Sequence, residues 1–196
     1  TMEASKAADC YGLMEGNDIE VADADQAYTQ SLLGGVKTWL RLPREQWPQK
    51  WIDANYKDPV CPLLLSLYGH PDAGGYWEKH CEAHLTKVGW KPIGSGWRSC
   101  FWHAECETML VIYVDDFKMA GKATNLPPMW KQISKYFDLE PPTKLIDNNY
   151  LGCAQKEVQI PQETMKLRSE LYRTLFDHTV GRRIESSTDK PNTANT

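Results

Sequence analysis

The stretch LVIYVDDFKMAG, from Leu110 to Gly121, places two adjacent aspartates, Asp115 and Asp116, directly after an apolar run. The residues MLVIYV are β-prone and short enough for one buried strand, which would carry one or both carboxylates at its tip. Neither aspartate has a lysine or arginine next to it in the sequence, and two like charges side by side repel each other. A divalent cation would neutralise them, because Mg²⁺ prefers oxygen ligands. The alternative interpretation is that the pair opens an ordinary surface turn.

A third carboxylate that could share this cation is Asp23. The segment DIEVADADQAY, residues 18–28, alternates apolar and acidic residues as a half-buried strand does, and Asp23 falls near its end. If this strand lies beside the strand that ends in Asp115 and Asp116, the three side chains meet. Such carboxylates can hold two metal ions, which stabilise the attacking and leaving oxygens of a phosphoryl transfer.

The composition is that of a globular chain of one domain or slightly more. Its 196 residues are 41% hydrophobic and 24% charged, and no run approaches the roughly 20 apolar residues that a membrane span requires. The six cysteines are scattered and follow no secretory leader, which favours reduced thiols and a protein that is not secreted. The sequence opens on Thr1, so we expect a fragment of a longer protein.

The formal net charge of -4 is unevenly distributed along the chain. Residues 1–117 carry 10 Lys and Arg against 17 Asp and Glu, residues 118–183 carry 11 against 7, and residues 184–196 carry 1 against 2. An acidic, cation-dependent site followed by a surface that attracts phosphate would have this pattern. A chance distribution is equally compatible with the counts.

Local patterns predict an α+β fold in which an antiparallel sheet carries helices on one face. Trp77, Cys81 and Leu85 form one helical stripe that stops at Gly89. Two β-prone runs joined by a short polar turn indicate an antiparallel hairpin formed by residues 95–105 and 107–116. The other expected elements are helices at 1–16, 127–137 and 170–181, strands at 18–28 and 37–43, a buried extended or helical segment at 60–69, a hairpin of 148–160 with 164–169, and a polar, disordered tail at 184–196.

Several of these segments together resemble one protein family. The motifs DADQAY, SLYG followed by the aromatic helix YWEKH, YVDD, and YLGC occur here in that order. In order and spacing they resemble the reverse transcriptases of the Ty1/copia class of retroelements, from Thr1 to about Val180. The resemblance implies an RNA-directed DNA polymerase fragment without its N-terminal fingers region. It also implies a palm-like region with the catalytic aspartates at 1–125, the end of the palm and a thumb-like region at 126–183, and the tail at 184–196.

The family's first motif has the form D-x-x-x-A-[FY]. Asp23, Ala27 and Tyr28 satisfy it, so the resemblance implies that Asp23 is a metal ligand and that the backbone carbonyl of Ala24 is another. It implies that the backbone N–H groups of Gln26 and Ala27 face the incoming triphosphate. The ring of Tyr28 would stack under the sugar and exclude a 2′-hydroxyl by clash. Without the motif, a plain core tyrosine is an equally good interpretation of Tyr28.

The later motifs supply the remaining implied roles. Tyr113 would contact the primer strand, Asp115 and Asp116 would hold Mg²⁺ or Mn²⁺, and Gly69 would let the nascent base pair pass close to the backbone. The implied partners are an RNA template with a DNA primer, deoxynucleoside triphosphates and other parts of a retroelement polyprotein, with no membrane. The implied location is a cytoplasmic virus-like particle or the nucleus.

The chain also departs from the family at four positions. Leu65, Pro71, Asp72 and Gly75 stand where the family usually has basic or amide residues that contact nucleic acid or nucleotide. A channel for a charged duplex requires cations on its walls. An alternative function is therefore an inactive remnant that binds nucleic acid weakly through the basic residues between Lys118 and Arg183.

A second alternative is a zinc-stabilised interaction module. His80 and His84 are spaced i and i+4 on the predicted helix, and Cys100, His103 and Cys106 lie close together in the sequence, as does Cys81 beside His80. These are zinc-ligand types. In a strand, however, Cys100 and Cys106 would point to one face and His103 to the other, so we expect no convergence.

Overall fold

The computed structural model describes residues 2–94, 96–156 and 158–176. By its internal contacts the chain divides into two compact units, Thr1–Gln155 and Lys156–Thr196. The sheet and the candidate site belong to the first unit, and the predicted tail lies outside the described residues. The elements are α1 (Met2–Gly12), β1 (Asn17–Asp23), η1 (Ala27–Gln30), β2 (Trp39–Leu40), η2 (Arg44–Gln46), α2 (Gln49–Asp53), β3 (Cys61–Pro62), α3 (Ala73–Lys87), β4 (Lys91–Pro92), β5 (Cys100–His103), β6 (Thr108–Tyr113), β7 (Asp116–Lys122), α4 (Leu126–Ile133), β8 (Thr143–Lys144), η3 (Leu145–Asp147), β9 (Asn149–Tyr150), β10 (Cys153–Ala154) and α5 (Gln162–Phe176).

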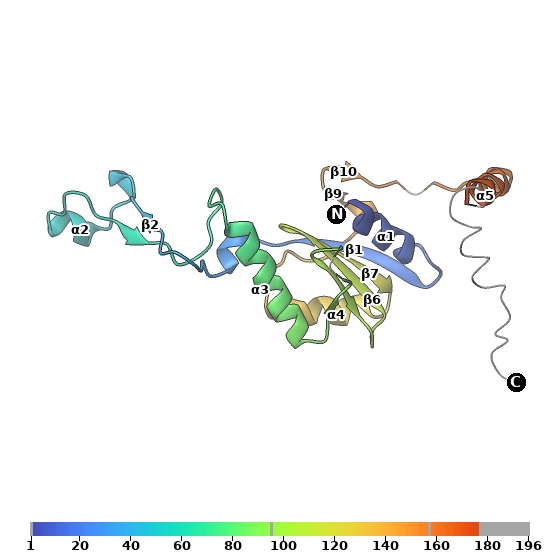
Figure 1. The fold of residues 1–196 in the computed structure, drawn as a ribbon, viewed down its shortest axis with the longest axis horizontal. Helices are drawn as coiled ribbons and strands as arrows, with labels where there is room; N and C mark the ends of the chain where they lie inside the picture. Colours follow the sequence, from blue (N-terminus) through green and yellow to red (C-terminus); the bar gives the residue numbers. More distant parts are fainter. Residues whose placement is uncertain (1, 95, 157, 177–196) are drawn as a thin grey trace, which may run out of the picture. The chain divides into compact units, whose positions relative to one another are not determined.

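The central element is a six-stranded antiparallel sheet in the order β4-β5-β6-β7-β1-β8 (Figure 1). The predicted hairpin is present as β5 and β6, and β6 forms a second hairpin with β7. β1, which comes from the start of the chain, pairs with the other edge of β7. The predicted α+β class with an antiparallel sheet is therefore confirmed. The sequence analysis did not identify β7 as a strand.

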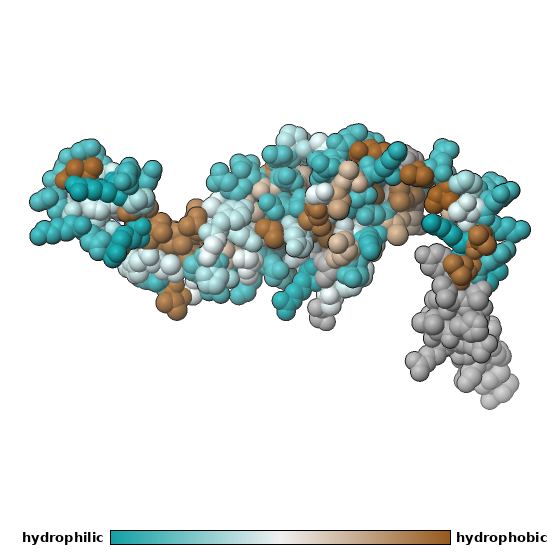
Figure 2. Space-filling view, turned by 90° about the horizontal axis from the view of Figure 1, so that it is seen from above, coloured by the Kyte–Doolittle hydropathy of each residue, from teal (hydrophilic) through white to brown (hydrophobic). Residues whose placement is uncertain are grey.

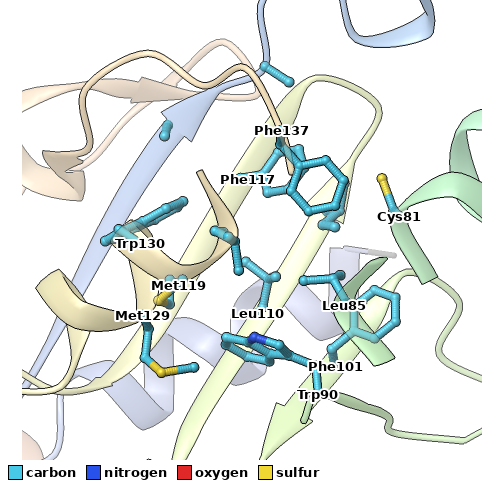
Figure 3. Close-up of a cluster of buried hydrophobic side chains, with 14 of the residues drawn as sticks. Cys81, Leu85, Trp90, Phe101, Leu110, Phe117, Met119, Met129, Trp130 and Phe137 are labelled. Atoms are coloured by element: carbon cyan, nitrogen blue, oxygen red, sulfur yellow. The ribbon is translucent and has the colours of Figure 1, made fainter. Parts of the chain in front are cut away.

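α3 and α4 cover one face of the sheet (Figure 1). Leu110, Phe117 and Met119 project from β6 and β7 into the core on this side (Figure 3). The stripe of α3 packs against them through Trp77 and Leu85, and all five side chains are at most 1% exposed. Burial of a side chain of this size contributes roughly 1.5–3 kcal/mol. The predicted helical stripe is confirmed, and it is the part of α3 that fixes the helix on the sheet.

The opposite face of the sheet is covered by α1. Ala4 and Ala8 of this helix are fully buried and share a second core cluster with Val21, Val111 and Ala120 from three adjacent strands. The prediction that helices lie on one face is therefore wrong. The reason is that nearly every side chain of β6 and β7 is buried, and a strand that is buried on both faces needs cover on both.

Residues 31–69 contain a small two-stranded sheet, in which β2 pairs with β3. The segment at 60–69 is extended, as one of the two predictions had it, but it is not buried: Leu64, Leu65 and Leu67 are 67%, 44% and 39% exposed. The leucine run lacks the period of either a helix stripe or a half-buried strand, so its apolar character alone misled the prediction. On the face seen in Figure 2, hydrophobic residues reach the surface in several separate patches.

The C-terminal part is more helical than predicted. β9 and β10 form a short hairpin within residues 149–154, so the expected pairing of 148–160 with 164–169 is wrong. Residues 164–169 belong to α5. The six residues 164–169 are too few to distinguish the helical period from the strand period. They include good helix formers, and the helix continues through them to Phe176. No helix among the described residues is long and apolar enough to cross a membrane.

Candidate active site

The sheet brings the two acidic segments of the sequence into direct contact. In the antiparallel register of β1 and β7, Asp23 lies opposite Asp116. The backbone N–H of Ala24 donates to the carbonyl oxygen of Asp115 at 2.8 Å, and Asp116 also pairs with Tyr113 across the β6–β7 hairpin. Residues 92 or more positions apart in sequence thus share one end of the sheet. Asp23 and Asp115 are exposed there and Asp116 is half-buried.

The turn that carries Asp115 is strained. Only Val114 and Asp115 separate β6 from β7, and Val114 has a φ of 57°. A two-residue hairpin needs a positive φ, which normally calls for Gly or Asn, and a β-branched residue in that conformation is an outlier. The buried Trp77 of α3 compensates, because its indole Nε1 donates to the carbonyl of Val114 at 2.6 Å. Strain of this kind concentrates at functional sites.

A second segment fixes the end of β1. The N–H of Glu140 donates to the carbonyl of Asp23 at 2.8 Å, and the N–H of Asp25 donates to the carbonyl of Asp138 at 3.0 Å. The side chain of Gln30 holds the same segment, because its amide accepts from the Asp138 N–H at 2.9 Å and donates to the Asp138 carbonyl at 3.0 Å. The backbone on both sides of Asp23 is therefore tied down while its carboxylate stays exposed.

The negative charges of Asp23 and Asp115 disfavour the ionised form of Asp116. Burial raises the pKa of Asp116 to about 6, and the charges of Asp23 and Asp115 add to the rise, as does a hydrogen bond with the Asp23 side chain. Lys118, two residues along the same strand, opposes the rise. At neutral pH the folded protein thus holds a carboxylate cluster that a bound cation would stabilise.

Lys118 is a fully buried cation beneath this cluster, on the α1 face of β7. Its Nζ donates to Asp9 Oδ1 at 2.7 Å and to Ser5 Oγ at 2.8 Å, and it lies 4.0 Å from the ring centroid of Tyr150. The sequence analysis counted Lys118 among residues that could contact nucleic acid, which is wrong because its side chain is 1% exposed. A lone lysine inside the apolar run FKMAG was the available signal.

The other predicted site residues come from three segments: Gln26, Ala27 and Tyr28 at η1, Tyr113 at the end of β6, and Gly69 after β3. Gln26 adopts a left-handed conformation at the start of η1, with Ala27 buried behind it. Tyr28 and Tyr113 both line a pocket of about 350 Å³ beside α3. Gly69 has a φ of 92°, a conformation that side chains rarely adopt, and a Cβ there would meet nothing within 4 Å. A glycine is therefore favoured at position 69 by the backbone conformation, and the space beside it is open.

The side chains of Asp23, Asp115 and Asp116 at the end of the sheet offer only oxygen atoms, which is the donor type that hard cations such as Mg²⁺ or Mn²⁺ prefer. Among the described residues, however, no three His, Cys, Asp or Glu side chains are arranged to hold a metal ion. The same finding applies to the candidate zinc ligands. His80 instead stacks on Trp77, with ring centroids 5.6 Å apart, and lies 4.3 Å from His84.

The packing of His80 leads to a pH-dependent stability. Burial lowers the pKa of His80 below its usual value, and the positive charges of His84 and Lys87 add to this. A histidine whose pKa is lower in the folded state binds its proton more readily in the unfolded chain. Its stabilising contribution is therefore present above the unfolded pKa of about 6.5 and is lost as the pH falls from there through the lower folded pKa.

We expect His80→Phe to flatten this dependence. The free energy of unfolding, measured with urea at pH 7.5 and pH 5.5, should fall less on acidification in the variant than in the unmodified protein, because phenylalanine keeps the ring packing without a titrating group. An equal loss in His80→Phe would contradict the assignment.

No family model, no curated protein and no solved structure matches this chain. The functional interpretation therefore depends on the residues at the end of the sheet and on the sequence motifs that contain them.

Proposed function

We propose that this chain carries the nucleotidyl-transfer site of an RNA-directed DNA polymerase of the Ty1/copia type. The observation that supports the proposal most strongly is the register of β1 and β7, in which Asp23 and Asp116 are directly opposed. The two residues belong to the two motifs that the family resemblance links, and the resemblance requires them to be neighbours. The strained turn at Val114 and the raised pKa of Asp116 also fit a functional site.

In the proposed reaction, the primer 3′-hydroxyl attacks the α-phosphate of a deoxynucleoside triphosphate. A bond forms between the primer oxygen and phosphorus, the bond to the β-phosphate oxygen breaks, and pyrophosphate leaves. Asp23, Asp115 and Asp116, with the carbonyl of Ala24, would hold Mg²⁺ or Mn²⁺. When bound, these ions would neutralise the charge on the attacking and leaving oxygens.

The chain's own residues would position the substrates. The backbone N–H groups of Gln26 and Ala27 would face the triphosphate, and the ring of Tyr28 would lie under the sugar. Tyr113, which is 55% exposed, would contact the primer strand. Gly69 would leave room for the nascent base pair. Such positioning contributes much of the catalysis in phosphoryl transfer, since the protein does little covalent chemistry itself.

The alternative to an active polymerase is a decayed remnant that binds nucleic acid. The family usually has basic or amide residues at four positions where this chain has Leu65, Pro71, Asp72 and Gly75, so those polar contacts are lost. We therefore expect slow extension of a primed RNA template. The proposed partners are an RNA template, a DNA primer, deoxynucleoside triphosphates and the rest of a retroelement polyprotein. The proposed location is a virus-like particle or the nucleus.

The proposal is tested by metal binding and extension together. Asp23→Asn should weaken Mn²⁺ binding, measured by electron paramagnetic resonance, and should abolish extension. Asp25→Asn is the matched control: this carboxylate is also exposed and lies two residues further on, and its loss should leave both readouts unchanged. Metal binding without any extension would favour the remnant, and zinc in the purified protein would favour the interaction module.

A further inference from the structure

Two tyrosine rings from separate motifs lie against each other beside the carboxylate turn. The ring centroids of Tyr28 and Tyr68 are 4.5 Å apart, with 39° between the ring planes. Tyr28 is half-buried and Tyr68 is 49% exposed. Aromatic pairs at this separation attract each other beyond the effect of their burial. The family resemblance gave a role to Tyr28 and none to Tyr68.

Backbone and side-chain hydrogen bonds join the segments that lie next to the two tyrosines in the chain. The N–H of Ser66 donates to the carbonyl of Ser31 at 2.9 Å, and the N–H of Leu33 donates to the carbonyl of Leu64 at 2.9 Å. The hydroxyls of Ser31 and Ser66, both buried, are hydrogen-bonded at 3.0 Å. The segment that carries Tyr68 is therefore attached to the segment that follows Tyr28.

The Tyr68 ring also lies within electrostatic reach of the carboxylates. Burial raises the pKa of Tyr68, and the negative charges of Asp115 and Asp25 raise it further against a backbone hydrogen bond at Tyr28. Tyr68 therefore keeps its proton at neutral pH. Its ring packs against that of Tyr28.

Tyr28 is half-buried and has the Tyr68 ring packed against one side of its own ring. Together with Gly74 and Trp77 of α3 it lines the pocket beside that helix. A ring rejects an extra oxygen atom by clash only while it cannot move away. Removing Tyr68 leaves space on one side of the Tyr28 ring.

We propose that Tyr68 is a positioning residue for sugar selection: it holds the Tyr28 ring in place so that this ring excludes a nucleotide with a 2′-hydroxyl. This inference rests on the proposed nucleotide site at Asp23 and Asp116. It adds a specificity role for a residue of the SLYG motif. The selection acts through Tyr28, because Tyr28 lines the pocket beside α3 and Tyr68 is not among the described residues that line it.

Equilibrium binding of dATP and ATP to the full chain, in the presence of Mn²⁺, tests the inference, because these two ligands differ only in the 2′-hydroxyl. The unmodified protein should prefer dATP. Tyr68→Ala should reduce this preference by about fivefold to tenfold, the range expected for one aromatic pair. Tyr68→Phe should retain the preference, and Tyr56→Ala, at another exposed tyrosine, is the matched control.

A double-mutant cycle separates positioning from direct contact. Tyr28→Ala should lose the preference, and Tyr28→Ala with Tyr68→Ala should lose no more, because a positioning residue has no effect once its target is gone. Additive losses would overturn the positioning role. Tyr68→Leu, which keeps apolar bulk without a ring, serves if Tyr68→Ala does not fold, and circular dichroism establishes folding.

The outcomes distinguish this inference from the proposed function. If the unmodified chain prefers dATP and Tyr68→Ala retains the full preference, the role of Tyr68 is overturned and the nucleotide site stands. If the unmodified chain binds neither nucleotide, the proposed function itself is overturned, and the inference falls with it.

Discussion

Asp116→Asn is expected to abolish primer extension, with a loss of at least about 100-fold, while making the protein more stable. Asparagine keeps the shape of the side chain but cannot supply the charge that holds a divalent cation. Burial raises the pKa of the Asp116 carboxyl to about 6, and the charges of Asp23 and Asp115 add to the rise. Removal of the repulsion should raise the free energy of unfolding by about 1 kcal/mol at pH 7.5, after allowance for solvent screening at a partly exposed group.

The pH dependence of this gain follows from the direction of the pKa shift. Because the folded state disfavours ionised Asp116, the destabilisation is present above pH 6, where the group is ionised in both states. It disappears below the unfolded value of about 3.9, where the group is protonated in both. Urea unfolding of Asp116→Asn and the unmodified protein should therefore differ at pH 7.5 and converge near pH 4.

The combination of the two effects is the informative result. Lower activity with higher stability identifies a residue retained for function at a cost to folding. If Asp116→Asn loses stability, the residue has a structural role, and the turn is the ordinary surface turn of the alternative interpretation. Unchanged extension would remove Asp116 from the site.

The sequence predicted the elements whose patterns are long and regular. The stripe of Trp77, Cys81 and Leu85 has a helical period over three turns, and α3 packs on the sheet through it. The alternation around Asp23 predicted β1, although the strand stops at Asp23 instead of continuing to residue 28. The following residues leave the extended conformation because Gln26 has a left-handed backbone conformation. The spacing of apolar residues in the sequence does not indicate such a conformation.

The parts that were missed depend on contacts between distant residues. β7 contains Gly121 and Lys118, which are both unusual inside a strand, so its pattern predicted nothing. Gly121 is required because a Cβ there would lie 2.8 Å from the Glu107 carbonyl. The hydrogen bond from Trp77 to the strained Val114 links residues 37 positions apart. No local pattern contains such information.

The site also depends on where the two carboxylate strands lie. β7 and β1 are inner strands of the sheet, with β6 and β8 outside them, and both faces are covered. A rigid strand pair can hold two like charges close together, because the surrounding packing outweighs their repulsion. The candidate ligands thus lie on strands that the packing of the core already holds rigid. A binding site for small, highly charged groups requires such rigidity.

The largest expected effect on stability comes from Asp9, the partner of Lys118. In Asp9→Asn the ammonium of Lys118 stays fully buried and keeps its contacts with Ser5 and the ring of Tyr150, but it loses its ion-pair partner. Loss of one member of a buried ion pair costs about 3 kcal/mol or more. Lys118→Met should cost less, about 1 kcal/mol, because the remaining Asp9 side chain is 27% exposed and can be hydrated.

Urea unfolding at pH 7 measures this asymmetry. The double variant Asp9→Asn with Lys118→Met carries no buried charge, so it should recover most of the stability lost in Asp9→Asn alone. Lys122→Met is the matched control on the same strand: Lys122 pairs with Glu107 at the surface, where its side chain is 56% exposed, and its loss should cost much less stability than Asp9→Asn. Equal costs for Asp9→Asn and Lys118→Met would show that Asp9 is not the counter-ion of Lys118. Lys118 would then be held beneath the carboxylates by Ser5 and Tyr150 alone.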